Sequence, residues 1–325
     1  MAEPELYKYK AEQLAEISNK PSLPEEMTGQ QPSPLHSIVP TGRFAPSPTG
    51  PLHYGSLLAA VASYLNIKAH NGTWLVRIED LDPPREMPGA ASEILHMLEH
   101  FGLYWDRQII YQSKRQNVYQ EALAELQNKN LVYPCSCSRK DIQARGEHVY
   151  AGHCRTGHIA GRKNYSIRIK VPDRKLLWQD LIQGSQSSRL FHANGDFVVR
   201  RADGLYAYHL AVVVDDASQG ITQSIRGADL LPSTSAQIFL QQALDIVPPQ
   251  YGHIPVAVNA HGVKLSKQTG ASPVAMGDPA RTLFKVLQDL GQEPPYDLQT
   301  SSVEDVLLWG GLNWALDKVP SRQVL

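Results

Sequence analysis

The sequence predicts an α/β fold: a parallel sheet that is split by an inserted segment and followed by a small, mainly helical region. Three observations predict it. A strand-like run, an apolar helix and a second strand-like run occupy residues 38–78, which is the pattern of a βαβ unit in a parallel sheet. A cysteine-bearing segment interrupts this alternation after residue 132, and the alternation resumes near residue 200. The 325 residues are enough for about two domains.

The first part of the chain gives the clearest element predictions. Residues 1–37 are polar and contain several prolines, so we expect a mobile extension there. The helix predicted over residues 55–69 carries apolar side chains on one face at helical spacing, and a buried strand follows at 74–78. Two further helices are expected, at 89–101 and 113–128.

Shorter patterns predict the rest of the chain. Leu210–Val214 is a continuous apolar run with three valines, which we interpret as a short buried strand ending in two aspartates. The other expected elements are β-like runs at 165–171 and 196–199, a strand at 221–226, a helix at 233–244, a strand near Ile254, and a helical tail with a capping-box pattern at Ser301–Glu304.

Composition and charge restrict the class of protein. Lys and Arg number 31 and Asp and Glu 32, giving a formal net charge of -1. A nucleic-acid contact would therefore depend on local basic patches. The N-terminus has neither the basic start nor the apolar core of a signal peptide, and no apolar run approaches the ~20 residues of a membrane span. We expect a cytoplasmic monomer without a membrane partner.

The cysteines are the most specific metal signal. The chain has three, Cys135, Cys137 and Cys154, all in one short stretch, which indicates a metal site in a reducing compartment rather than a disulfide framework. Three thiolates and one further donor complete a tetrahedral zinc site. Tyr150 and His153 are the two candidate fourth donors, and general zinc chemistry favours His153. Three spare thiols without a metal are the alternative.

Two loops indicate phosphate chemistry. The first, residues 46–56, lies between a predicted strand and a predicted helix, where free backbone N–H groups suit a phosphate. Within it, His53 can donate to a phosphate as negative charge develops, and Gly55 allows close approach to the backbone. The second, Lys264–Lys267, places two lysines on a glycine-bounded loop that can clamp a polyphosphate. Either loop alone could be a solvated surface loop, but together they indicate a nucleotide site.

The two loops resemble a known pair of motifs. His53–Ser56 and Lys264–Gln268 are similar to the two signature motifs of class I aminoacyl-tRNA synthetases. Segments that resemble the glutamyl branch of that class are Arg43–Gly50, Arg77–Arg85, Val212–Asp216, Gly220–Thr222 and Arg226–Asp229. The cysteine segment with Tyr150, and the end of the chain soon after the second loop, resemble the glutamyl-Q tRNA(Asp) synthetase family. Tyr54, Ser56 and Leu265 depart slightly from the usual motifs.

The resemblance implies a fold, an activity and a division of the chain. The fold would be a class I, Rossmann-like parallel sheet split by a zinc-bearing insertion. Residues 38–132 and 200–258 would form the catalytic domain, 133–199 a zinc-containing, acceptor-binding-like insertion, and 259–325 the second loop and a helical stem-contact-like subdomain. The activity would be that of a ligase: ATP and Mg²⁺ activate L-glutamate without tRNA, and glutamate is then transferred to queuosine at the wobble position of tRNA(Asp).

The resemblance also assigns residues. A substrate with two carboxylates and one ammonium requires guanidinium groups and an acid. The glutamate-binding residues implied are Arg43, Phe44, Ala45, Pro46, Ser47, Glu79, Tyr208 and Arg226. The ATP-binding residues implied are His53, Gly55, Ser56, Lys264, Ser266 and Lys267, of which His53 and Lys267 are also catalytic. The metal ligands implied are Cys135, Cys137, Tyr150 and Cys154, holding a structural Zn²⁺.

Two other functions fit the same sequence. One is a non-catalytic tRNA-binding relic of a glutamyl-tRNA synthetase, against which the retained His53, Gly55, Lys264 and Lys267 argue. The other is an adenylyltransferase that gives activated glutamate to an acceptor other than tRNA, which the near-neutral charge allows.

Overall fold

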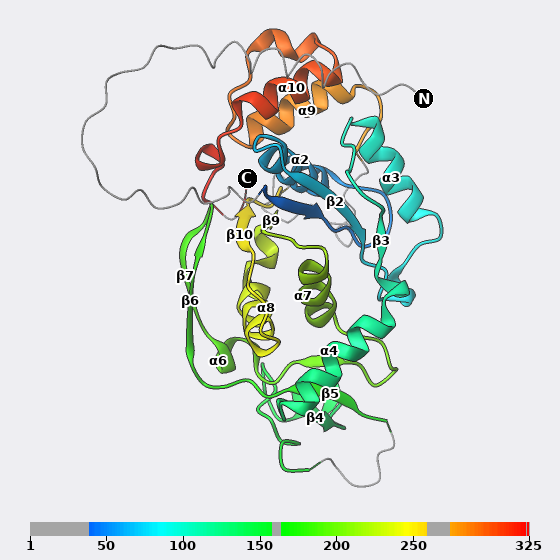
Figure 1. Cartoon of the computed structure of the whole chain (residues 1–325), viewed down its shortest axis with the longest axis vertical. Helices are drawn as coiled ribbons and strands as arrows, with labels where there is room; N and C mark the ends of the chain where they lie inside the picture. Colours follow the sequence, from blue (N-terminus) through cyan, green and yellow to red (C-terminus); the bar gives the residue numbers. More distant parts are fainter. Residues whose placement is uncertain (1–38, 158–163, 259–273, 323, 325) are drawn as a thin grey trace, which may run out of the picture. The chain divides into compact units, whose positions relative to one another are not determined.

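A computed structural model describes residues 39–157, 164–258, 274–322 and 324 (Figure 1). The N-terminal segment and the second lysine-bearing loop, Lys264–Gln268, therefore lie outside the described residues. None of the helices in the described ranges is both long enough and apolar enough to cross a bilayer.

The first half of the parallel sheet follows the predicted βαβ unit. Strand β1 (Thr41–Phe44) pairs in parallel with β2 (Thr73–Ile78), and β2 pairs in parallel with β3 (Ile110–Tyr111). Helix α2 (Tyr54–Lys68) connects β1 to β2. Most of its apolar side chains are buried, which places the helix against the sheet and makes it part of the core.

The second half of the sheet lies on the other side of β1. Strand β9 (Gln223–Gly227) pairs in parallel with β10 (Gln250–Ile254) over its whole length. Just before β9, the Thr222 N–H donates to the carbonyl of Thr41 at 2.9 Å, which joins the two halves. The carboxyl ends of β1 and β9 therefore lie at a common edge, where sheets of this kind bind ligands.

One predicted strand is wrong. Leu210–Val214 belongs to helix α7 (Tyr208–Ser218). The helix is buried over Leu210–Asp216, so it has no solvent-exposed face there and its sequence lacks the 3.6-residue alternation of a surface helix. A short buried apolar run rich in β-branched residues does not distinguish a strand from a buried helix.

The inserted segment contains a small antiparallel sheet and a hairpin. Strand β5 (Ser166–Ile169) pairs with β4 (Val132–Cys135) and with β8 (Val198–Arg200). The hairpin of β6 (Lys175–Asp180) and β7 (Gly184–Arg189) was not anticipated from the sequence. Strand β6 joins β10 in parallel, so the hairpin extends the main sheet.

The predicted helices at 89–101, 113–128 and 233–244 and the helical tail are all present, whereas two short helices of the inserted segment were not predicted. The tail helix α10 (Val303–Asn313) has Ser302 as its N-cap, whose capping box uses Asp305, one residue beyond the predicted pattern. The other α-helices in the described ranges are α3 (Ala90–His100), α4 (Gln116–Asn128), α5 (Arg139–Ala144), α6 (Leu190–Asn194), α8 (Leu231–Ala243) and α9 (Pro279–Asp289). Figure 1 shows α9 and α10 beside α2, with which they share one apolar core.

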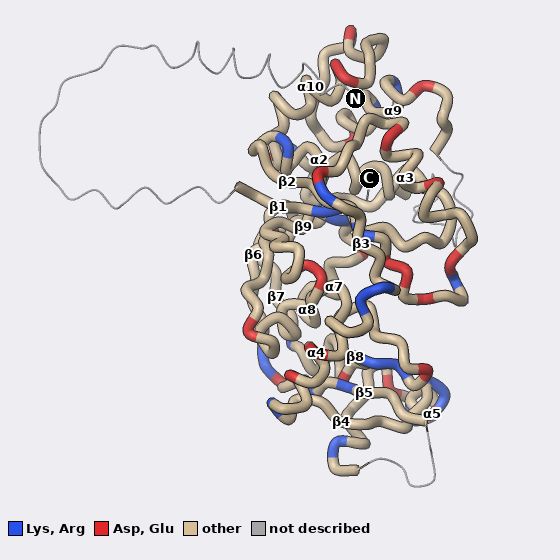
Figure 2. The backbone as a smooth tube through the Cα atoms, turned by 45° about the vertical axis from the view of Figure 1, so that its right-hand side comes forward, with Lys and Arg blue, Asp and Glu red and all other residues tan. Residues whose placement is uncertain are grey.

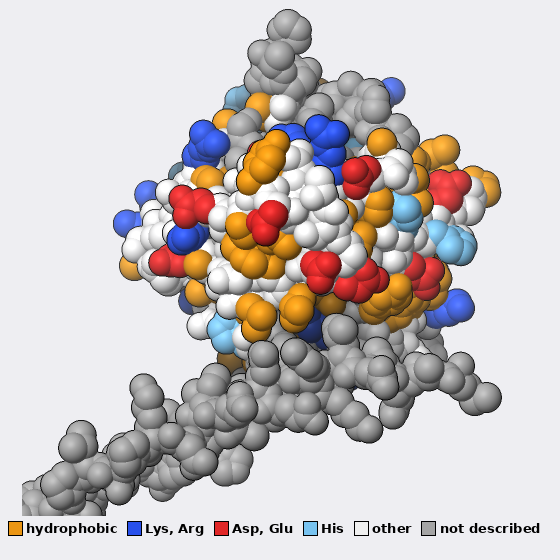
Figure 3. Space-filling model, turned by 90° about the horizontal axis from the view of Figure 1, so that it is seen from above, with side chains coloured by type: hydrophobic (Ala, Val, Ile, Leu, Met, Phe, Trp, Pro, Cys, Tyr) orange, Lys and Arg blue, Asp and Glu red, His pale blue; other side chains and the backbone are white. Residues whose placement is uncertain are grey.

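Charge is mixed over the described surface. Basic and acidic residues alternate along the backbone, with Lys and Arg gathered near β5, β8 and α5 (Figure 2). On the face above α9 and α10, hydrophobic side chains are interspersed with charged and polar ones (Figure 3).

Candidate active site and cysteine cluster

A cavity of about 460 Å³ lies at the carboxyl edge of the sheet. It brings together residues from β1, the loop after it, the start of α2, the residue that follows β2, α7 and β9. The predicted residues that line it are Arg43, Phe44, Ala45, Pro46, Ser47, His53, Gly55, Ser56, Glu79, Tyr208 and Arg226. Of the predicted nucleotide and glutamate residues, Lys264, Ser266 and Lys267 alone are not placed, because they lie outside the described residues.

His53 is fixed by the start of helix α2. It is the N-cap residue, and its Nδ1 accepts the Ser56 N–H at 3.3 Å. A Cβ added at Gly55 would lie 3.3 Å from two atoms of the His53 ring, which is closer than most real Cβ contacts. The glycine therefore allows the imidazole to lie against the first turn, where backbone N–H groups and the helix dipole favour an anion.

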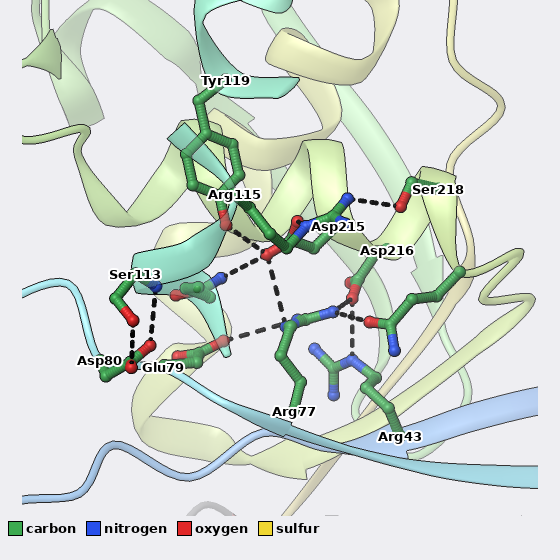
Figure 4. Close-up of polar contacts among 12 residues, drawn as sticks. Arg43, Arg77, Glu79, Asp80, Ser113, Arg115, Tyr119, Asp215, Asp216 and Ser218 are labelled. Atoms are coloured by element: carbon green, nitrogen blue, oxygen red, sulfur yellow. Dashed lines mark hydrogen bonds and ion pairs between the residues drawn. The ribbon is translucent and has the colours of Figure 1, made fainter. Parts of the chain in front are cut away.

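A buried network of charges lies behind the cavity (Figure 4). Asp216 of α7 accepts hydrogen bonds from Arg77 Nη1 at 2.7 Å and from Arg43 Nε at 3.2 Å. The neighbouring Asp215 accepts from Tyr119 at 2.8 Å and from Arg115 at 2.5 Å. Arg77 and both aspartates are almost completely buried. The ion pairs that Asp216 of α7 makes with Arg43 of β1 and Arg77 of β2 thus position the Arg43 side chain.

Glu79 lies at the edge of this network. Its Oε1 is 3.4 Å from Arg77 Nη2. Burial raises the pKa of Glu79, and Arg77 and Arg43 only partly oppose this effect, so the pKa is about 7. A cavity carboxylate with a perturbed pKa is a candidate functional group, and its acceptor oxygens suit a substrate ammonium.

Arg226 of β9 is held from three sides. Its Nε donates to His253 Nε2 at 3.0 Å, its Nη2 donates to Thr234 at 3.0 Å, and its guanidinium lies 4.8 Å from the centre of the Tyr251 ring. Its Nη1 has no hydrogen-bond partner among the described residues. Tyr208 lines the cavity nearby, and burial raises the pKa of its phenol.

Several lining residues were missed by sequence reasoning. They are Thr49, Leu52, Ala59, Ile225, Gly227, Asp229, Leu230, Pro255 and Val256. The signal for Gly227 and Asp229 was present, because both stand in the Arg226–Asp229 segment that carries the resemblance. A Cβ at Gly227 would lie 2.5 Å from Asp229 Oδ1, so a larger residue there would displace the Asp229 carboxylate. Thr49 likewise stands in the Arg43–Gly50 segment, and the others are apolar residues with no chemical signature of their own.

A second cavity of about 870 Å³ adjoins the first. The two share Ser47, Glu79 and Tyr208. The second extends toward the cysteine segment, and its basic lining residues are Arg85, Arg139, Arg168 and Arg201. A cationic hollow continuous with the first cavity suits a phosphate-bearing partner.

The three cysteines converge as predicted. The sulfurs of Cys135, Cys137 and Cys154 all lie within 4.8 Å of one another, and all three residues are buried. Burial alone would raise the pKa of the Cys154 thiol, but hydrogen bonds, chiefly that of Tyr150, lower it to about 7. Thiolate is the metal-binding form of cysteine. This donor set could hold a metal ion.

The two candidate fourth donors differ in position. The Tyr150 hydroxyl lies 3.6 Å from Cys137 Sγ and accepts the Cys154 N–H at 2.9 Å. The His153 ring instead contacts Glu147 and is 43% exposed. Arg168 lies 4.2 Å from the centre of the Tyr150 ring. The geometry favours Tyr150 as the donor nearest the sulfurs.

Comparisons with known proteins agree with the fold. Residues 39–306 match the family described as tRNA synthetases class I (E and Q), catalytic domain. The glutamyl-Q tRNA(Asp) synthetase of Neisseria meningitidis serogroup B (strain ATCC BAA-335 / MC58) is 51% identical over 294 residues, covering 87% of this chain and 98% of that protein. The glutamyl-Q tRNA(Asp) synthetase of Dechloromonas aromatica (strain RCB) is 49% identical over 291 residues, covering 87% and 97%.

A solved structure has the same fold. The crystal structure of a glutamate tRNA ligase from Elizabethkingia meningosepticum CCUG26117 in complex with its amino acid has a TM-score of 0.75 and 26% sequence identity. The match covers 87% of this chain and 66% of that one, so the chain spans about two thirds of its length. The fold is that of a class I tRNA synthetase. The protein is therefore a ligase of the aminoacyl-tRNA synthetase type. Within that class, the chain belongs to the glutamyl-Q tRNA(Asp) synthetase family.

Proposed function

We propose that the chain activates L-glutamate with ATP in the absence of tRNA and then transfers the glutamate to queuosine at the wobble position of tRNA(Asp). The observation that carries the activation step is the first cavity, in which Arg43, Arg226 and Glu79 meet His53 and the start of α2. The names of the curated relatives support tRNA(Asp) as acceptor.

In the proposed activation, the substrate is recognised by its charges. The guanidinium groups of Arg43 and Arg226 bind its carboxylates, Glu79 binds its ammonium, and Tyr208 and the Phe44–Ser47 segment complete the pocket. Asp216 and Arg77 orient Arg43 from behind.

The proposed chemistry requires positioning and electrostatic stabilisation, without a covalent enzyme intermediate. The glutamate α-carboxylate attacks the α-phosphorus of ATP, and pyrophosphate leaves. His53 and the first N–H groups of α2 are placed to stabilise negative charge that develops on the α-phosphate. Lys264, Ser266 and Lys267 would bind the leaving pyrophosphate. Mg²⁺, which this class uses with ATP, neutralises phosphate charge when bound.

We further propose that the cysteine cluster binds one structural Zn²⁺. Cys135, Cys137, Cys154 and Tyr150 would hold it, because these four donors are already buried together. Four protein ligands leave no open position for catalysis. The ion would stabilise segment 133–199, whose basic residues beside the second cavity would contact the RNA.

A two-stage assay tests the function. ATP–pyrophosphate exchange should require glutamate and proceed without RNA, and labelled glutamate should then be transferred to tRNA(Asp) that contains queuosine and not to the same tRNA without it. Exchange without transfer to either tRNA would indicate the adenylyltransferase with another acceptor. Absence of exchange would indicate the non-catalytic relic.

A further inference from the structure

Arg226 is the end of a buried hydrogen-bonded chain that crosses three strands. His253 of β10 accepts the Arg226 Nε–H at its Nε2, at 3.0 Å. The His253 Nδ1 contacts Asp180 Oδ2 at 2.5 Å, at the end of β6. Asp180 and His253 are completely buried, and neither lines the cavity. They act on the site only through Arg226.

The hydrogen bonds to Arg226 and Asp180 fix the tautomer of His253. An arginine Nε can only donate, so Nε2 of His253 must accept and its proton must be on Nδ1, where it is donated to Asp180. Burial and the neighbouring Arg226 lower the pKa of His253, although Asp180 opposes them. Burial alone would raise the pKa of Asp180, but His253 and backbone N–H groups lower it. A neutral imidazole beside a carboxylate is what this arrangement requires.

Asp180 is itself fixed in orientation. Its Oδ1 accepts three backbone N–H groups, from Gln183 at 2.9 Å and from Ile182 and His253 at 3.1 Å. Only Oδ2 faces the imidazole ring. The β6–β7 hairpin of the inserted segment therefore anchors the series of hydrogen bonds that ends at Arg226 in the first cavity.

We propose that Asp180 and His253 are positioning residues for glutamate binding. They hold the Arg226 guanidinium, together with Thr234, so that two of its nitrogens are engaged by the protein and Nη1 remains for a substrate carboxylate. The inference rests on the proposed role of Arg226 as a glutamate-binding residue.

Asp180→Asn is the sharpest test, because the two carboxylate oxygens are not equivalent. The three backbone donors require an acceptor at the Oδ1 position, so the amide NH₂ must face His253 Nδ1. His253 must then accept at Nδ1 and carry its proton on Nε2, opposite the Arg226 Nε–H. The same change of tautomer follows when the aspartate of a serine protease triad becomes asparagine.

We expect Asp180→Asn to raise the KM for glutamate in ATP–pyrophosphate exchange about tenfold or more, as loss of a charged hydrogen bond predicts. The KM for ATP should change by less than about twofold, because the change removes an interaction with glutamate alone. Asp173→Asn is the matched control, since Asp173 pairs with Arg189 at the surface of the same segment. It should leave both constants unchanged.

A second pair of variants keeps the test valid if Asp180→Asn folds poorly. His253→Gln retains one donor and one acceptor on neighbouring atoms and should keep the KM for glutamate near wild type, whereas His253→Leu should raise it. Nitrogen NMR of histidine-labelled enzyme gives an independent readout: the His253 signals, assigned by their absence in His253→Gln, should report the Nδ1–H tautomer in the wild type and the Nε2–H tautomer in Asp180→Asn.

The outcomes separate the inference from the function on which it rests. If Arg226→Ala does not raise the KM for glutamate, the glutamate-binding role of Arg226 is wrong. If Arg226→Ala raises it while Asp180→Asn and His253→Leu do not, the positioning inference alone is wrong. Equal increases in the KM for glutamate and for ATP would also overturn it, because they would indicate a general structural role.

Discussion

Glu79 and Asp216 show how two buried carboxylates beside the same arginine acquire opposite properties. Asp216 accepts hydrogen bonds from both Arg77 and Arg43, and these outweigh burial, so its pKa is lowered. Glu79 has one long contact with Arg77, at 3.4 Å, and burial raises its pKa to about 7. One carboxylate is committed to holding arginines, and the other remains available to a ligand.

The pKa of Glu79 predicts a pH dependence of glutamate binding. Below pH 7 Glu79 becomes protonated and neutral, whereas the substrate ammonium stays charged, so their attraction is lost as pH falls. We expect kcat/KM for glutamate in ATP–pyrophosphate exchange to fall as pH decreases through about 7, since this quantity reports groups of the free enzyme.

Glu79→Gln is the control for this profile. It should have a low kcat/KM at every pH and should lack the inflection near pH 7 that Glu79 produces. Every histidine is retained in Glu79→Gln, so an inflection caused by a histidine would appear in both proteins. An inflection that persists unchanged in Glu79→Gln would therefore contradict the assignment.

Sequence reasoning identified the residues that line the first cavity better than those that support them. Arg43, Glu79 and Arg226 belong to segments with a recognisable motif, and the structure brings them together. Asp180 and His253 have no local signature. Their role arises from a contact across 73 residues of sequence, which only the pairing of β6 with β10 creates.

At the scale of elements, periodicity succeeded where one face is buried and failed elsewhere. Helix α3, predicted at 89–101, buries one face through Ala90, Ile94, Met97 and Leu98, whereas α7, predicted as a strand, is buried over Leu210–Asp216. The sequence pattern does not predict the β6–β7 hairpin, because β7 consists mainly of polar residues, with serines facing outward. Burial on all sides and exposure on most sides both remove the pattern on which such predictions depend.

The start of helix α2 gives a prediction about an element boundary. In Gly55→Ala, the new Cβ would lie 3.3 Å from the His53 ring and 3.8 Å from Ala257. The imidazole must shift by a few tenths of an ångström from its place against the first turn, while the helix itself gains propensity. We expect kcat in ATP–pyrophosphate exchange to fall by roughly tenfold or more, as for loss of one charge-stabilising donor.

Gly311→Ala in α10 is the matched control. A Cβ there would meet no heavy atom within 4 Å, so the substitution changes helix propensity without touching the cavity. It should leave kcat unchanged, and thermal unfolding should show that both variants are folded. Wild-type kcat in Gly55→Ala would show that the position of His53 does not depend on this glycine.

In the described part of the molecule, the buried apolar side chains form three clusters of unequal size. One cluster joins α2, β1, β2, α3, α9 and α10, and a second joins α4, α7 and α8 with β5. The third consists only of Tyr133, Cys135, Cys137, Tyr150 and Cys154. A cluster this small cannot stabilise a segment by burial alone, and such regions commonly depend on a metal ion.

The proposed Zn²⁺ should therefore matter more for RNA transfer than for glutamate activation. The cysteine cluster adjoins the second cavity through Cys137, whereas the first cavity is built on the parallel sheet. Cys154→Ser should lose the metal, lower transfer to tRNA by at least about tenfold, and retain most ATP–pyrophosphate exchange.

Metal analysis after dialysis against a chelator identifies the fourth ligand: Tyr150→Phe should lower zinc retention, because its hydroxyl lies 3.6 Å from Cys137 Sγ. His153→Ala should retain zinc, because that ring contacts Glu147 instead. The reverse pattern would make His153 the ligand, and full retention in Cys154→Ser would show that the cluster does not hold zinc.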